Sequence, residues 1–152
     1  MKEEKIAPNS QIEAGKRVEE FTPKIIAFCC YPSAYESADM AGEMRLTFPE
    51  GLRIVRVPCS GRVDLIYILK AFEMGFDGVM IMACHEDNCK YLRGNYRARK
   101  RVQYIKSVLE ELGLEKERVE LFNLASNMGT RFSEMVNHMN QTIKRLGPSP
   151  LR

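Results

Sequence analysis

The run Gly78-Val-Met-Ile-Met-Ala83, which is followed directly by Cys84, says more about the fold than any other stretch of the chain. Its residues are apolar on both faces, as expected for a central strand of a parallel sheet, and we place this strand at 76–83. Short apolar runs bounded by turn residues predict buried strands. Such runs place the other three strands at 24–30, 52–57 and 117–124.

Apolar residues at helical spacing follow each predicted strand. They predict helices over 33–46, from the Gly61 loop to Gly75, from the loop 84–95 to Gly113, and from Ser126 to Gly147. We expect Ser33 to cap the first helix, with Glu36 completing a capping box. The second helix is expected to bury one face, made of Leu65, Ile68, Leu69 and Phe72.

The order βαβαβαβα with right-handed crossovers predicts an α/β fold, a flavodoxin-like three-layer sandwich around a central four-stranded parallel sheet. Residues 1–22 are polar and charged without a clear period, and we interpret them as a flexible N-terminal arm. The domain is expected to span 23–147, with a C-terminal tail at 148–152.

The chain has 152 residues with 23 basic and 20 acidic side chains, a net charge of +3. This near balance does not indicate a nucleic-acid partner. The sequence has no apolar stretch of ~20 residues and no signal-peptide pattern at its start, so we expect a cytoplasmic protein without a membrane span. Basic residues crowd 93–101, which is either a solvated helix face or a docking patch for an acidic partner surface.

Cysteines are the candidate functional residues. In a reducing compartment they are more often ligands or redox groups than disulfides. Because the carboxyl ends of parallel strands share one edge of the sheet, cysteines that are distant in sequence should converge there. Four of the five lie at a predicted strand end or in the loop after one: Cys30, Cys59, Cys84 and Cys89. Cys29 is still within its strand and is expected to be a packing residue, although a one-residue change in register would exchange the faces of Cys29 and Cys30.

Four thiolates at one point suit iron–sulfur or zinc. The spacing is neither that of a zinc ribbon nor that of a 4Fe–4S ferredoxin, and the Cys-x4-Cys pair with two distant cysteines is compatible with a 2Fe–2S cluster. His85 could hydrogen-bond a cluster sulfur or serve as a zinc ligand. A low-molecular-weight phosphatase is excluded because no arginine stands six residues after any cysteine. A zinc-binding module, a thiol-redox protein and a cluster-free structural adaptor remain alternatives.

Several motifs together are similar to one known family. They are Phe28-Cys29-Cys30, Ala38-Asp39 with Ala41-Gly42, Arg53-Ile-Val-Arg-Val-Pro-Cys-Ser-Gly-Arg62, Cys84-His85 with Cys89, and Gly94-Asn95-Tyr96 with Lys100-Arg101-Val102. The combination resembles the delta subunit of methyl-viologen-reducing hydrogenase, the MvhD-like iron–sulfur family. The resemblance covers roughly 23–146.

This resemblance implies a non-catalytic electron-transfer subunit that carries one 2Fe–2S cluster. Its implied partners are a heterodisulfide-reductase-A-type FAD and iron–sulfur subunit, where electron bifurcation takes place, and a hydrogenase, formate dehydrogenase or other dehydrogenase module. The implied cluster ligands are Cys30, Cys59, Cys84 and Cys89. Arg62 and Lys90 stand beside two of these cysteines, and their positive charge is expected to stabilise the reduced cluster.

The sequence departs from the family pattern at four positions. Relatives usually have a third cysteine in the first loop, where this chain has Ser33, and it also has Ala83, Asn88 and Lys90 in the second cysteine block. Five cysteines still suffice for four ligands. A serine oxygen in place of a thiolate is expected to lower the reduction potential. The segment 93–101 and the arm 1–22 are the expected docking surfaces.

Overall fold

The computed structural model describes residues 20–152. Its centre is a sheet of four parallel strands in the order β2-β1-β3-β4. The strands are β1 (Ile25–Cys30), β2 (Leu52–Val57), β3 (Gly78–Cys84) and β4 (Val119–Leu124). The predicted α/β sandwich with a four-stranded parallel sheet is confirmed. Most of the predicted arm, residues 1–19, lies outside the described residues.

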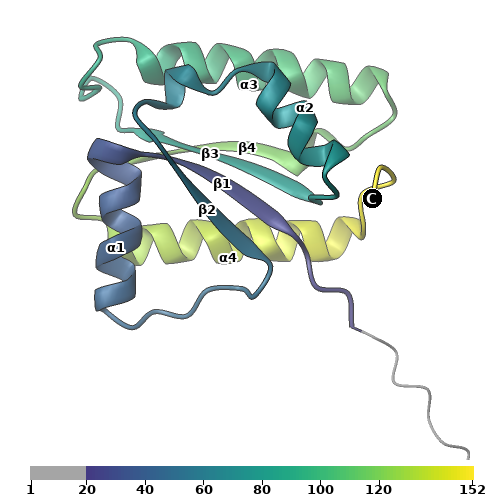
Figure 1. Ribbon diagram of the computed structural model, residues 1–152, viewed down its shortest axis with the longest axis horizontal. Coiled ribbons are helices and arrows are strands. Elements are labelled where there is room, and N and C mark those ends of the chain that lie inside the picture. The colour runs from purple at the N-terminus through teal and green to yellow at the C-terminus, as the bar shows by residue number, and fades with distance from the viewer. Residues whose placement is uncertain (1–19) are drawn as a thin grey trace, which may run out of the picture.

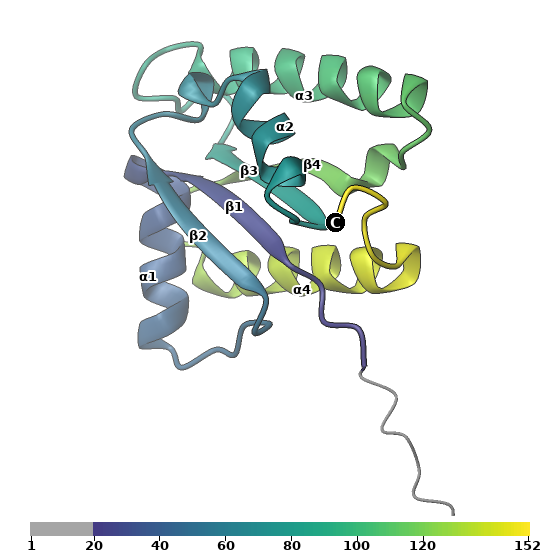
Figure 2. The same ribbon diagram turned by 45° about the vertical axis from the view of Figure 1, so that its right-hand side comes forward.

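Helices cover both faces of this sheet (Figure 1). They are α1 (Glu36–Glu43), α2 (Leu65–Glu73), α3 (Gly94–Glu111) and α4 (Gly129–Leu146). Helices α1 and α4 lie on one face, and α2 and α3 lie on the other, an arrangement that the turned view in Figure 2 also shows. Two separate hydrophobic clusters fill the two layers between sheet and helices. Within residues 20–152, no helix is both long and apolar enough to cross a membrane.

The central strand β3 is buried along its whole length, as its apolar sequence predicts. It pairs with β1 through Ile25↔Gly78 to Cys29↔Met82, and with β4 through Val79↔Val119 to Cys84↔Leu124. Strand β2 is an edge strand, and four consecutive residues of it are exposed. The carboxyl ends of β1 and β3 therefore lie side by side in the middle of the sheet.

The first helix begins differently from the prediction. A π-helical turn, Tyr31–Tyr35, comes between β1 and α1, and Cys30 rather than Ser33 precedes it. Ser33 lies inside this turn and is buried. The capping box was wrong because the turn already begins at Tyr31, one residue after the strand, where the fixed φ of Pro32 favours a helical turn before Ser33.

Two further details differ from the prediction. Leu69 is 41% exposed, whereas its neighbours Ile68 and Phe72 are buried, so the apolar face of α2 is narrower than expected. Helix α1 ends at Glu43, ahead of Arg45, which has a φ of 56°. The left-handed conformation at Arg45 stops the helix before the predicted end at residue 46.

Candidate functional site

Two thiols meet where the central strands end. Cys30 is the last residue of β1 and Cys84 is the last residue of β3, and both side chains are buried. Their Sγ atoms are 3.2 Å apart, and either can donate the hydrogen bond. The parallel pairing of β1 with β3 therefore brings together two cysteines that are separated by 54 residues of chain.

This pair of thiols shares its protons unequally. The hydrogen bond from Cys30 lowers the pKa of Cys84 to about 5, and the hydroxyl of Ser33, the backbone N–H of Lys90 and the thiol of Cys89 act in the same direction. The same hydrogen bond and burial raise the pKa of Cys30. Cys84 therefore loses its proton at a lower pH than Cys30 does, because the S–H of Cys30 stabilises the neighbouring Cys84 thiolate.

A second pair of thiols, Cys59 and Cys89, lies beside the first. Cys59 precedes the 3-10 turn Ser60–Arg62, and Cys89 lies in the loop between β3 and α3. Burial raises the pKa of Cys59, and the nearby Cys89 thiol adds to this rise. Gly94, the first residue of α3, packs against both sulfurs, and a Cβ at this position would lie 3.3 Å from Cys89 Sγ and overlap with Cys59 Sγ.

Backbone N–H groups lie near three of these sulfurs. The N–H of Ser60 lowers the pKa of Cys30, that of Gly61 lowers the pKa of Cys59, and that of Lys90 lowers the pKa of Cys84. This is the effect expected of a donor that stabilises a thiolate. Ser60, Gly61 and Lys90 lie in the loops after β2 and β3, so the positions of these donors depend on the paths of the loops and not on strand pairing.

Two asparagine side chains hold the loop after β3 in place. Asn123 Nδ2 donates to the carbonyl of Cys84 at 2.6 Å, and Asn95 Nδ2 donates to the carbonyl of His85 at 3.0 Å. The backbone N–H of His85 also donates to Leu124 O at 3.0 Å. Asn123 was not predicted from the sequence as part of the site, and Asn95 was noted only as part of the Gly-Asn-Tyr motif.

The structure distinguishes Cys29 from Cys30. Cys29 is buried in the cluster between the sheet and helices α1 and α4, and its Sγ lies 3.8 Å from the carbonyl of Ala27. Burial raises its pKa to about 12. Because side chains alternate along a strand, Cys30 points away from this cluster, and at the end of β1 its Sγ lies 3.2 Å from Cys84 Sγ.

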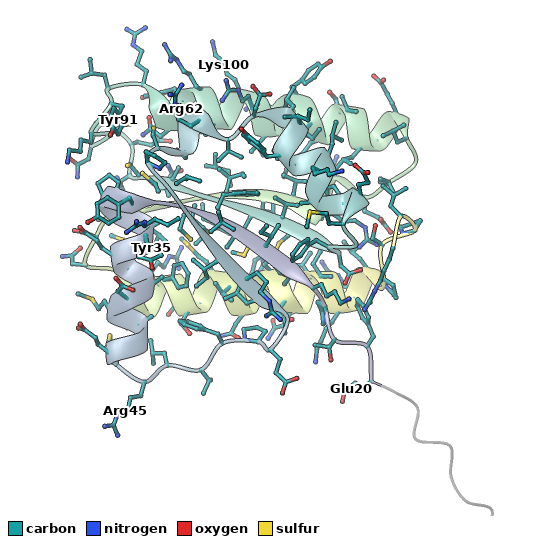
Figure 3. The ribbon with its side chains drawn as sticks, in the orientation of Figure 1. Glu20, Tyr35, Arg45, Arg62, Tyr91 and Lys100 are labelled. Carbon is teal, nitrogen blue, oxygen red and sulfur yellow. The ribbon has the colours of Figure 1, made fainter. Side chains whose placement is uncertain are left out.

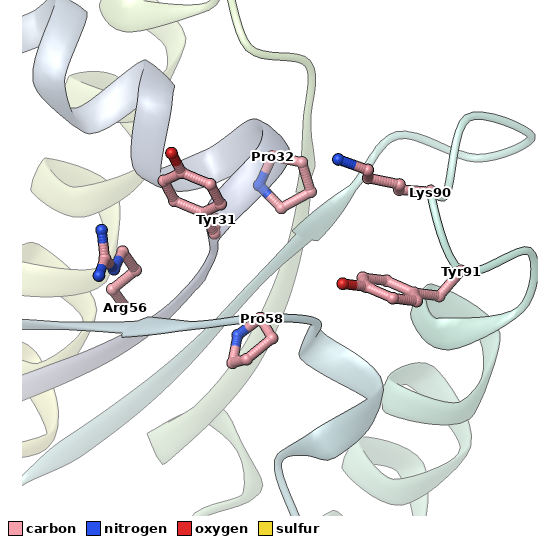
Figure 4. A pocket seen from close by; sticks show the side chains of 6 residues that line it. All are labelled: Tyr31, Pro32, Arg56, Pro58, Lys90 and Tyr91. Carbon is pink, nitrogen blue, oxygen red and sulfur yellow. The ribbon is translucent and has the colours of Figure 1, made fainter.

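The three charged or polar residues expected around the cysteines lie at the rim of the site. Arg62, His85 and Lys90 are exposed. The Nδ1 atom of His85 lies 3.4 Å from the carbonyl of Glu86. Lys90 and Tyr91 line a pocket of about 470 Å³ together with Tyr31, Pro32, Arg56 and Pro58 (Figure 4).

In the basic segment 93–101, some side chains hold neighbouring loops and others are exposed to solvent. Arg101 donates to the carbonyls of Gly61 at 2.5 Å and Val63 at 3.2 Å, and so fastens the Cys59 loop to α3. Arg99 forms an ion pair with Glu86. Both side chains are partly exposed and are held by these contacts. The exposed charges that remain are Arg93, Arg97 and Lys100. Figure 3 shows Tyr91, Arg62 and Lys100 on the same end of the molecule.

The four thiols gather at the carboxyl end of the sheet as two neighbouring pairs. The sulfurs of Cys30 and Cys84 are 3.2 Å apart, and the sulfurs of Cys59 and Cys89 both lie beside Gly94. Two buried hydroxyls, of Ser33 and Ser60, also find no hydrogen-bond partner of ordinary geometry within the described chain. Thiolate ligands and hydrogen-bond donors near the sulfurs are features that suit an iron–sulfur cluster.

Comparisons with known proteins find similar chains. Residues 25–147 match the family model described as "Methyl-viologen-reducing hydrogenase, delta subunit". The chain is 42% identical to the D-type iron–sulfur subunit of the vhu F420-non-reducing hydrogenase of Methanocaldococcus jannaschii, over 86% of this chain and 97% of the relative. The corresponding D-type iron–sulfur subunit of the F420-non-reducing hydrogenase of Archaeoglobus profundus is also 42% identical, over 86% of this chain and 95% of its own.

A third relative is much longer. The A-type subunit of the ferredoxin/F420H2-dependent CoB-CoM heterodisulfide reductase of Methanosarcina acetivorans is 36% identical over 126 residues, which are 83% of this chain but 16% of the relative. The same domain therefore occurs both as a separate subunit and as part of a longer polypeptide. From the match over residues 25–147 and these identities, the chain belongs to the family of methyl-viologen-reducing hydrogenase delta subunits.

Proposed function

We propose that this chain is an electron-transfer subunit that carries a 2Fe–2S cluster on Cys30, Cys59, Cys84 and Cys89. The observation that carries the proposal is the arrangement of these thiols in two adjacent pairs. Each iron of a 2Fe–2S cluster takes two protein ligands, whereas a structural zinc ion takes four around one point. When bound, such a cluster accepts and passes on one electron at a time.

The surroundings of the thiols support the same function. The three backbone N–H groups near the sulfurs stabilise thiolate charge, and the rim cations Arg62 and Lys90 add positive potential. Hydrogen bonds to sulfur and nearby charge are the protein's means of setting a cluster's potential. His85 is the third residue that we place around the cluster. The names of the M. jannaschii and A. profundus relatives describe iron–sulfur subunits.

The relatives also indicate the partners. A domain that forms part of the A-type polypeptide of a heterodisulfide reductase in one organism is expected to dock on a polypeptide of that type where it is a separate chain. We infer that this chain relays electrons in the cytoplasm between a hydrogenase, formate dehydrogenase or other dehydrogenase module and such a flavoprotein, which carries out any electron bifurcation. The exposed side chains of Tyr91, Arg93, Arg97 and Lys100, at the end of the molecule that holds the thiols, suit an acidic partner surface.

The test is the iron and acid-labile sulfide content of anaerobically purified protein, together with an EPR spectrum after dithionite reduction. We expect about two irons and two sulfides per chain and a spin-½ signal. Cys59→Ala and Cys84→Ala should abolish the signal. Cys29→Ala should retain it, because Cys29 faces the other layer of the core. Zinc in place of iron would instead favour a zinc-binding adaptor, and metal-free protein would contradict both.

One observation favours a second candidate, a thiol-redox function. The sulfurs of Cys30 and Cys84 are close together, and the pKa of Cys84 is lowered by the hydrogen bond from Cys30. A low thiol pKa is typical of reactive cysteines. If this function is correct, iodoacetamide should modify Cys84 rapidly in protein that has been purified anaerobically, and oxidation should link Cys84 to Cys30. A bound cluster should protect both residues from alkylation.

A further inference from the structure

The hydroxyl group of Ser33 is buried and has no hydrogen-bond partner among residues 20–152. The residue lies in the π-helical turn Tyr31–Tyr35 and is 5% exposed. An unpaired buried hydroxyl costs free energy, so we expect the Ser33 hydroxyl to have a hydrogen-bond partner in the functional protein.

The surroundings of Ser33 identify that partner as sulfur. The turn directly follows Cys30, and Ser33 lines a pocket of about 320 Å³ together with Cys84 and Cys89. Cys30, which this turn follows, is the residue whose sulfur lies 3.2 Å from that of Cys84. The hydroxyl is therefore placed to donate its proton to this pair of sulfurs.

A donor role fits the proposed ligand set better than a ligand role. The two thiol pairs already supply four ligands, so Ser33 is not needed to complete the coordination. An iron ligand would have to be the alkoxide, which requires the loss of a proton that the hydroxyl otherwise keeps. A donor uses that same proton without ionisation.

We propose that Ser33 donates an O–H···S hydrogen bond to the Cys30–Cys84 sulfur pair of the cluster-bound protein and thereby raises its reduction potential. This inference rests on the function proposed above. The reduced state places more negative charge on the sulfurs than the oxidised state does, so a hydrogen bond to sulfur stabilises it more. Ser33 would be a positioning and tuning residue rather than a ligand.

The experiment compares wild-type protein with Ser33→Ala, and uses Ser133→Ala as the matched control. Ser133 is also a largely buried serine, but it lies in α4 and its hydroxyl accepts a hydrogen bond from Asn137. We expect Ser33→Ala to keep the wild-type iron and sulfide content and to shift the midpoint potential to a more negative value. Ser133→Ala should show no shift. Electron–nuclear double resonance of the reduced wild-type protein should detect an exchangeable proton that disappears in Ser33→Ala.

Three results would overturn parts of this reasoning, and they can be told apart. An unchanged potential and an unchanged proton signal in Ser33→Ala would refute the hydrogen bond and leave the cluster in place. Loss of iron in Ser33→Ala, with iron retained in Ser33→Cys, would identify Ser33 as an oxygen ligand instead. Wild-type protein without iron would refute the proposed function and this inference with it.

Discussion

Gly94 offers a sharp test of the site because it separates iron binding from folding. It is the first residue of α3, and its Cα packs directly against the sulfurs of Cys59 and Cys89. The change Gly94→Ala places a methyl group where Cys59 Sγ lies and 3.3 Å from Cys89 Sγ. The Cys59 side chain can relieve the overlap by rotating about its single side-chain torsion, but its sulfur would then leave the group.

The expected effect on stability is moderate. Overpacking of a buried site costs about 1–3 kcal/mol. Gly94 is the first residue of α3, where alanine gains little over glycine in helix propensity. A loss of about 1–3 kcal/mol is one that a domain of this size tolerates. Iron binding is affected more strongly, because one of the four proposed ligands is displaced.

The assay combines urea denaturation with the iron and sulfide content of the anaerobically purified protein. Gly94→Ala should fold with a urea midpoint moderately below that of the wild type and lose most of its iron and visible absorption. Gly42→Ala is the matched control. Gly42 lies in α1, and no described atom lies within 4 Å of a Cβ added there. This control should keep its iron and should not lose stability.

A Gly94→Ala protein with full wild-type iron content would refute the reasoning. It would mean that Cys59 is free to leave its observed position without loss of the cluster, and that the contact between Gly94 and the two sulfurs is only packing. Loss of iron accompanied by complete unfolding would point to a structural rather than a ligand-placing role for Gly94.

Three further predictions concern the fold and its surface. Arg118 is buried and donates to the carbonyls of Asp77, Gly147 and Pro148, so Arg118→Ala should lower the free energy of unfolding by ~3 kcal/mol in urea denaturation. Arg131→Ala, at an exposed ion pair, should change it by under ~0.5 kcal/mol in the same assay. Arg118 lowers the pKa of Glu115 below 4.5, so the stabilisation by this pair is complete above that pH and is lost as the pH falls through the lowered pKa. The difference in melting temperature between the wild type and Glu115→Gln should therefore shrink in acid. A constant difference would contradict the pairing. Lys100→Glu should slow association with a heterodisulfide-reductase-A-type flavoprotein and weaken its salt dependence in stopped-flow measurements, and an unchanged rate would remove α3 from the docking surface.

Much of the architecture follows from local sequence patterns. The apolar run 78–84 predicts the central strand, because burial on both faces demands apolar residues at successive positions. The other runs also predict strands, although β2 lies at the edge of the sheet and four of its residues are exposed. The helical periods between them then leave few possible topologies. The helix starts were less predictable: the capping box at Ser33 was wrong, because a π-helical turn already begins at Tyr31.

The gathering of the cysteines at one edge of the sheet follows from the sequence alone, since parallel strands place all their carboxyl ends there. Which sulfurs meet depends on the packing of the whole domain. The adjacency of β1 and β3 pairs Cys30 with Cys84, and the alternation of side chains turns Cys29 into the opposite layer. The close approach of Gly94 brings Cys59 to Cys89. These contacts arise from strand order, register and loop path, which are set by long-range packing and leave no trace in the spacing of the cysteines.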